Sequence, residues 1–314
     1  MRSVALRRPA AALLLAIAAA VAATVVAACS GGTSGAHSTG KIVAVGAESE
    51  YADVIGQVGG QYVQVSAIMS NPSTDPHTFE ASIAVSRQVG NAQLVVQNGL
   101  GYDSFMNTIE SASPDSGRKV IDVQQLLKLP DSTPNPHLWY DPATMPRVAD
   151  AIAADLSAIQ PAHAAYFQAN AKAFGTSLKA LTGAIAGFRA SYPGTPVATT
   201  EPVADYLLAA LGADNLTPWT FQADVMNGVD PPPQNVAAVR ALFTQRRVKV
   251  LLYNQQVTDS LTESFITLAK QNNIPVVGVY ETMPVPGYDY QSWMLTEVQD
   301  LHKAVASKIS TEHL

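Results

Sequence analysis

The stretch AAYFQANAKAFGTSLKALTGAIAGFRA, residues 164–190, is the segment that decides the fold. Its apolar residues recur with the period of a helix. The stretch is unusually long for a globular protein, whose helices average roughly 10–14 residues. The motif YPG, residues 192–194, then ends the helical pattern. We therefore expect one bridging helix over residues 164–192.

Strand and helix patterns alternate on both sides of this segment. Before it, apolar runs predict strands at residues 41–46, 62–69, 92–96 and 119–123. After it, similar runs predict strands at residues 196–200, 248–253 and 274–280. Strands that alternate with helices form mostly parallel sheets flanked by helices. The predicted fold class is α/β, with lobes at residues 41–163 and 193–314 joined by the long helix and separated by a cleft.

The N-terminus has the pattern of an export signal. Three arginines within the first eight residues precede an uncharged, Ala-rich stretch, residues 9–28. The motif VAAC, residues 26–29, resembles a bacterial lipobox and contains Cys29, the only cysteine of the chain. A lone cysteine cannot form an internal disulfide, but its position suits lipid attachment. We expect residues 1–28 to be a lipoprotein signal peptide, and an uncleaved apolar anchor is the alternative.

The next segment and the charge of the chain add to this interpretation. Residues 29–40 are small and polar, which predicts a flexible tether. Either reading of the leader places the remaining chain outside the cytoplasm, at the cell membrane. The whole chain has a net charge of −6, and the leader holds only basic charges, so the rest is more acidic. This balance argues against nucleic acid as a partner, because nucleic acid requires basic patches.

Two histidines occur in matching local sequences. They are His77, within DPH, and His137, within NPH, and the chain has only six histidines. Each follows a predicted strand and precedes a helical segment. The preceding proline fixes the backbone in front of each imidazole. Imidazole is the commonest protein ligand for transition metals, so the two histidines are candidate ligands of one ion.

Two carboxylates complete the candidate site. Glu201 directly follows the run PVATT, and Glu281 directly follows IPVVGVY. In open α/β sheets, ligands bind beyond the carboxyl ends of the strands. We therefore expect His77 and His137 from the first lobe to meet Glu201 and Glu281 from the second. Taken singly, each has a simpler interpretation as a capping histidine, a helix start or a solvated loop residue.

The chain resembles the zinc/manganese solute-binding lipoproteins of ABC transporters, from about residue 41 to its end. The likeness rests on five motifs: DPHTFE (75–80), LVVQNGLGYDSFM (94–106), NPHLWYDP (135–142), AYFQANAKAF (165–174) and EPVADYLLAALG (201–212). The resemblance implies four metal ligands at His77, His137, Glu201 and Glu281. The family's fourth ligand is usually Asp, and Glu281 departs from that pattern.

The resemblance implies a receptor that captures a divalent metal and delivers it to a membrane permease, not an enzyme. We expect a monomer held at the extracytoplasmic face through Cys29. Carboxylates suit Mn²⁺ or Fe²⁺, whereas the general affinity order favours Zn²⁺. Zn²⁺ and Mn²⁺ are therefore both expected, and Fe²⁺ is less favoured. The alternatives are an extracytoplasmic metal-dependent hydrolase, with an open position for water, and an adhesin with a structural metal.

Overall fold

The computed structural model describes residues 40–73, 76–284 and 286–314. The predicted signal peptide, Cys29 and the tether lie outside the described residues. Within the described part, helices are too short or too polar to cross a membrane. The described chain from Gly40 onward forms a single unit.

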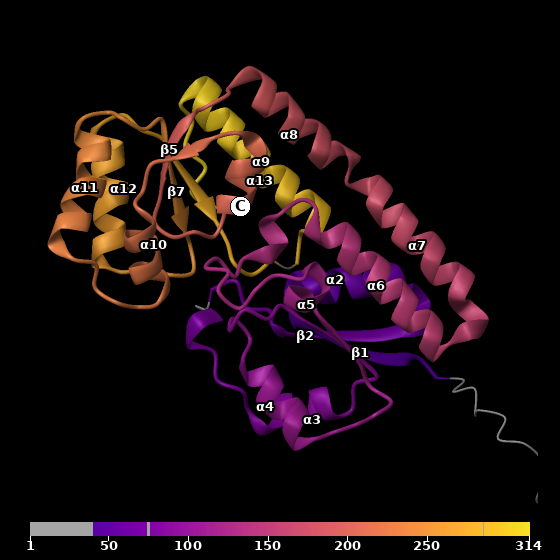
Figure 1. Ribbon diagram of the computed structural model, residues 1–314. Coiled ribbons are helices and arrows are strands. Elements are labelled where there is room, and N and C mark those ends of the chain that lie inside the picture. The colour runs from indigo at the N-terminus through magenta and orange to yellow at the C-terminus, as the bar shows by residue number, and fades with distance from the viewer. Residues whose placement is uncertain (1–39, 74–75, 285) are drawn as a thin grey trace, which may run out of the picture. The chain divides into compact units, whose positions relative to one another are not determined.

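The first sheet is built from four parallel strands in the order β2-β1-β3-β4. Figure 1 shows helices on both faces of this sheet, with α3 and α4 on the opposite side from α2 and α6. The predicted strand positions are confirmed to within a few residues. The bounds are β1 Ile42–Glu48, β2 Val63–Met69, β3 Leu94–Gln97, β4 Lys119–Asp122, α2 Ser49–Gly59, α3 Ile83–Gly90, α4 Phe105–Ala112, α5 Val123–Leu127 and α6 Thr144–Ile159.

The second sheet also has four parallel strands, in the order β6-β5-β7-β8. In Figure 1, helices α10, α11 and α12 cover one side, and α8, α9 and α13 lie on the other. Two elements, β6 and α10, were not indicated by the sequence. The bounds are β5 Pro196–Thr199, β6 Asp214–Asn215, β7 Val250–Asn254, β8 Val276–Val279, α9 Asp205–Leu211, α10 Trp219–Met226, α11 Pro233–Thr244, α12 Ser260–Gln271 and α13 Tyr290–Ser307.

The long bridging helix is confirmed, with one interruption. Helix α7, Ala164–Ser177, and helix α8, Lys179–Ser191, are separated by Leu178, which has φ −72° and ψ −3°. Just before this residue, Thr176 Oγ1 donates to the carbonyl of Lys172 at 2.9 Å, and Ser177 Oγ donates to that of Phe174 at 2.7 Å. Such hydroxyls compete with backbone donors and loosen the helix locally.

One apolar core spans both sheets and the bridging helix. It includes Ile42 of β1, Phe174 of α7, Ile185 of α8 and Val250 of β7. Along α7 and α8 the buried residues recur at spacings of three and four, which is the pattern of a helix with one buried face. Separating the two sheets would expose this shared core, at roughly 25 cal/mol for each Å² of apolar surface. The fold therefore favours small movements around the site over wide opening.

Candidate metal site

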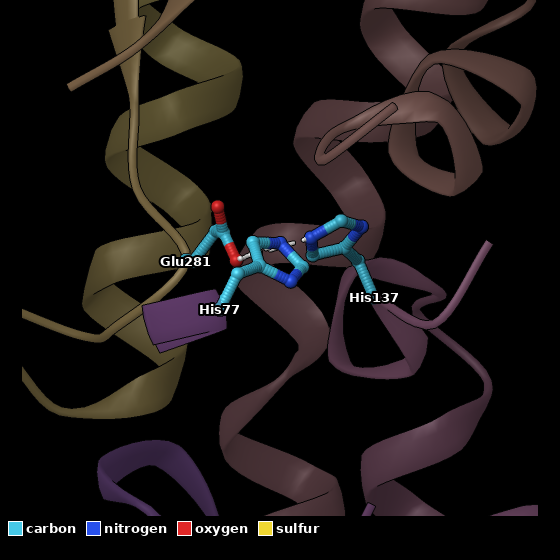
Figure 2. A group of neighbouring side chains, drawn as sticks. All are labelled: His77, His137 and Glu281. Carbon is cyan, nitrogen blue, oxygen red and sulfur yellow. Dashed lines mark ion pairs between the residues drawn. The ribbon is translucent and has the colours of Figure 1, made fainter. Parts of the chain in front are cut away.

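Three of the four predicted ligands converge. His77 lies in the short 3₁₀ turn Pro76–Thr78 after β2, His137 precedes the turn Leu138–Tyr140, and Glu281 follows β8. Their ligand atoms all lie within 4.8 Å of one another. Figure 2 shows the Glu281 carboxylate pointing toward both imidazoles. Its Oε2 is 3.2 Å from His77 Nε2 and 3.3 Å from His137 Nε2.

The three side chains differ in exposure to solvent. Those of His137 and Glu281 are fully buried, whereas that of His77 is 22% exposed. The imidazole planes of the two histidines are inclined by 82°, with their centroids 6.1 Å apart. A solvent molecule or ion therefore meets His77 first, and the other two groups form the floor of the site.

The tautomer of His137 follows from its partner Asn135. The oxygen Oδ1 of Asn135 accepts the backbone N–H of His137 at 3.1 Å, and its Nδ2 donates to the carbonyl of Pro202 at 2.8 Å. This fixes the amide orientation, so the contact of 2.7 Å between Oδ1 and His137 Nδ1 requires the proton on Nδ1. The lone pair of Nε2 consequently points to Glu281, and Nε2 makes no hydrogen bond to any described residue. A buried nitrogen lone pair facing a carboxylate fits a site for a cation.

The protonation of the two buried groups is set by their surroundings. Burial lowers the pKa of His137, so its imidazole is neutral at neutral pH. Burial opposes ionisation of Glu281, whereas hydrogen bonding to the imidazoles favours its ionised form and lowers its pKa. With Nε2 of His137 as an acceptor, His77, whose Nε2 is 3.2 Å from Oε2, is the imidazole that can donate to this carboxylate. The site therefore combines a neutral imidazole with a negative carboxylate, which are the protonation states that bind metals.

Glu201 is near the site but does not belong to the group of three. It is buried, at 2% exposure, just beyond the end of β5. Asn254, the last residue of β7, connects it to the site, since Asn254 Nδ2 donates to Glu201 Oε1 at 3.1 Å and to Glu281 Oε1 at 2.6 Å. Sequence reasoning missed Asn254, although the strand-end rule that found the carboxylates also applies to it.

Other polar groups hold Glu281 in place. Tyr102 Oη donates to its Oε2 at 2.9 Å. The backbone N–H groups of Glu281 and Thr282 donate to Gln256 Oε1 at 2.6 and 2.7 Å. Tyr140 Oη donates to the preceding carbonyl, that of Tyr280, at 2.7 Å. The position of the carboxylate is thus determined before any ion arrives.

Aromatic rings wall the buried side of the site. Trp139 is 0% exposed, and its ring lies 5.5 Å from that of His137 and 5.1 Å from that of Tyr102. Phe79, which follows His77 closely in the sequence, does not join this wall and packs instead against Phe105 of α4, with centroids 4.9 Å apart. The wall thus comes from residues 102 and 139, and it excludes water around His137.

Two additional buried carboxyl groups occur at the end of β1. Burial raises the pKa of Glu50 to about 8, and burial together with the charge of Asp103 raises that of Glu48 well above its usual value. Ser49 Oγ donates to Glu50 Oε2 at 3.2 Å. Glu50 is therefore mostly neutral at pH 7 and adds little repulsion to Glu281. The sequence alone did not indicate that Glu48 and Glu50 lie buried near the site.

Known proteins resemble the chain in both sequence and fold. The manganese-binding lipoprotein MntA of Bacillus subtilis (strain 168) is 26% identical over 155 residues, which are 48% of this chain and 50% of MntA. The iron-binding protein YfeA of Yersinia pestis is 22% identical over 251 residues, which are 75% of this chain and 78% of YfeA. The structure of the zinc-binding protein TroA from Treponema pallidum matches with a TM-score of 0.70 at 19% identity, covering 85% of this chain and 99% of that one.

The extent of these matches differs. In sequence, the chain spans half of the length of MntA and 37% of that of TroA. A family model for the periplasmic component A of zinc-uptake complexes (ZnuA) matches residues 45–304, which are most of the described chain. The chain therefore belongs to the ZnuA family of periplasmic zinc-uptake components.

Proposed function

We propose that the chain is an extracytoplasmic solute-binding receptor that captures a divalent transition metal, Zn²⁺ or Mn²⁺. The observation that carries this proposal is the pairing of His137 Nε2, a buried acceptor without a hydrogen bond to described residues, with Glu281 Oε2 at 3.3 Å. A cation at this position could be coordinated by both of these atoms and by His77. Two imidazoles and a carboxylate suit Zn²⁺, Mn²⁺ and Fe²⁺.

The proposed site takes its metal as cargo. His77, the partly exposed ligand, would meet the ion first, and the buried His137 and Glu281 would complete its coordination. Glu201, which Asn254 connects to Glu281, would be the fourth ligand. The metal would then pass to the permease of an ABC transporter. The names of the relatives, which mention manganese, zinc and iron, support this class of cargo.

The sequence pattern at the N-terminus supports a location for the receptor at the membrane. Cys29 follows the small residues of the motif VAAC, and the relative MntA is named a lipoprotein. We infer that Cys29 carries the lipid that holds the receptor at the outer face of the membrane. Stable anchoring by this route needs two or more acyl chains, since a single chain binds only reversibly.

The test is metal stoichiometry in the purified protein and in His77→Ala. After exposure to Zn²⁺ or Mn²⁺ and removal of free ions, elemental analysis is expected to find about one ion per wild-type chain and much less in the variant. Circular dichroism after chelation is expected to show a folded protein that rebinds metal, which separates a receptor from an adhesin with a structural metal. Wild-type protein without stoichiometric metal would overturn the proposal.

Metal affinity is expected to depend on pH through the histidines. The pKa of Glu281 is held low, so its carboxylate stays negative in mild acid. His137 binds metal only when neutral, and because burial lowers its pKa, protons compete with the metal only below the usual histidine value of about 6.5. Titration calorimetry is expected to show steady affinity from pH 8 to 7 and a loss of roughly 10–100-fold by pH 5. Flat affinity between pH 7 and 5 would contradict histidine ligation.

A further inference from the structure

Asn254 occupies the position between the two carboxylates of the site. It is the last residue of β7 and is 1% exposed. Its Nδ2 lies 2.6 Å from Glu281 Oε1 and 3.1 Å from Glu201 Oε1. An amide NH₂ group has two N–H donors, so one group can hold both carboxylates at once.

The orientation of this amide is determined by its other contacts. The backbone N–H of Gln256 donates to Asn254 Oδ1 at 3.0 Å, a position that only the oxygen can take. The backbone N–H of Asn254 in turn donates to Thr200 Oγ1 at 3.1 Å. The residue is therefore fixed at both ends, and its NH₂ group faces Glu201 and Glu281.

This contact limits how the carboxylates can bind an ion. One oxygen of each carboxylate, Oε1, is held by Asn254. The other oxygen of Glu281 faces both histidines and also accepts the hydroxyl of Tyr102 at 2.9 Å. Two-oxygen binding by either carboxylate would turn its Oε1 away from the Asn254 amide, so these bonds oppose it. The single bond from Tyr102 leaves a second lone pair on Glu281 Oε2 for an ion.

From this geometry we propose that Asn254 determines metal selectivity, by holding Glu201 and Glu281 as single-oxygen ligands and thereby favouring Zn²⁺ over Mn²⁺. Two imidazoles and two single carboxylate oxygens make the four-coordinate tetrahedral set that Zn²⁺ accepts. Mn²⁺ prefers an octahedral, oxygen-rich set, which needs two-oxygen carboxylates or added water. This inference rests on the proposed function, and it names the cargo that the site prefers.

The test compares Zn²⁺ and Mn²⁺ affinities in wild type, Asn254→Ala and the isosteric Asn254→Asp, by competition calorimetry. Loss of the NH₂ group is expected to release the second carboxylate oxygens and reduce the ratio of the Mn²⁺ to the Zn²⁺ dissociation constant by about 10-fold or more. The matched control is Asn215→Ala, because Asn215 Nδ2 also donates to a carboxylate, that of Asp205, at 2.7 Å, but outside the site. This control is expected to leave the ratio unchanged.

The outcomes separate this inference from the function itself. If wild type binds neither metal, the proposed function fails. If wild type binds metal and both affinities fall by the same factor in the Asn254 variants, Asn254 is only structural and the selectivity proposal is overturned. X-ray absorption spectroscopy of the Zn²⁺-loaded wild type tests the proposal without any substitution. A coordination number of four is expected, and five or six would overturn the proposal.

Discussion

Replacement of Glu281 by glutamine is expected to weaken metal binding by more than about 100-fold, which exceeds the 10–100-fold typical of residues that only support a ligand. Oε2 of Glu281 lies within 3.3 Å of Nε2 of both His77 and His137, so the carboxylate is the common partner of the two imidazoles. Glutamine keeps the shape but removes the negative charge. Titration calorimetry with Zn²⁺ and with Mn²⁺ measures the loss.

The matched control for this variant is Glu297→Gln. Glu297 is also buried, at 3% exposure, and its burial raises its pKa to about 8, so it is mostly neutral at pH 7. Its Oε1 accepts Trp293 Nε1 at 3.1 Å within α13 and Tyr140 Oη at 3.3 Å, and glutamine keeps an oxygen for both bonds; Glu297 lies outside the three-residue group. We expect Glu297→Gln to bind metal as the wild type does. Equal losses in the two variants would mean that replacing any buried carboxyl group disturbs the fold, and Glu281 would lose its assigned role.

The sequence predicted the fold well where periodicity alone decides an element. The strands of both sheets and the long bridging segment have strong apolar patterns, and the structure has them near the predicted positions. The two-residue strand β6 has no such pattern, because it exists only through its pairing with β5, where Pro196 faces Asp214. The interruption at Leu178 depends on two hydroxyl contacts, which no periodicity reveals.

The site was predictable to the extent that topology determines it. Parallel strands bring their carboxyl ends to one edge, which is why His77, His137 and Glu281 could be placed together from the sequence. The same rule placed Glu201 with them, whereas in the structure Glu201 lies outside the group of three and is connected to Glu281 through the amide of Asn254. Asn254 also stands at a strand end, but a neutral amide is a weaker metal ligand than an imidazole or a carboxylate, so its residue type does not indicate a metal site.

The buried acids near β1 were missed for a different reason. Glu50 lies in the first turn of α2, where acidic residues ordinarily favour the helix dipole. Only the tertiary structure shows that this residue is completely buried and that its pKa is raised to about 8. Whether an acidic residue at a helix start is charged therefore depends on how deeply it is buried, and its position in the sequence does not show this.

Trp139→Ala is expected to lower the free energy of unfolding by about 3–5 kcal/mol, the usual result of removing a buried aromatic ring. The ring is 0% exposed and contacts those of Tyr51, Tyr102 and His137, with centroids 6.4, 5.1 and 5.5 Å away. The resulting cavity also lies against His137, so we expect metal affinity to fall by about 10-fold. Urea unfolding of the metal-free protein and calorimetry measure the two effects.

Two further tryptophan variants make this prediction specific. Trp219→Ala removes the same side chain from α10, where it is 38% exposed, and is expected to cost about 1 kcal/mol or less with unchanged metal affinity. Trp139→Phe keeps a ring and removes Nε1, which makes no hydrogen bond within the described chain, so its cost is expected to stay below about 2 kcal/mol. If Trp139→Ala lost no more stability than Trp219→Ala, the ring would not be part of the core. If it lost stability but kept full affinity, the wall around His137 would support only the fold, and the imidazole would be held by Asn135 alone.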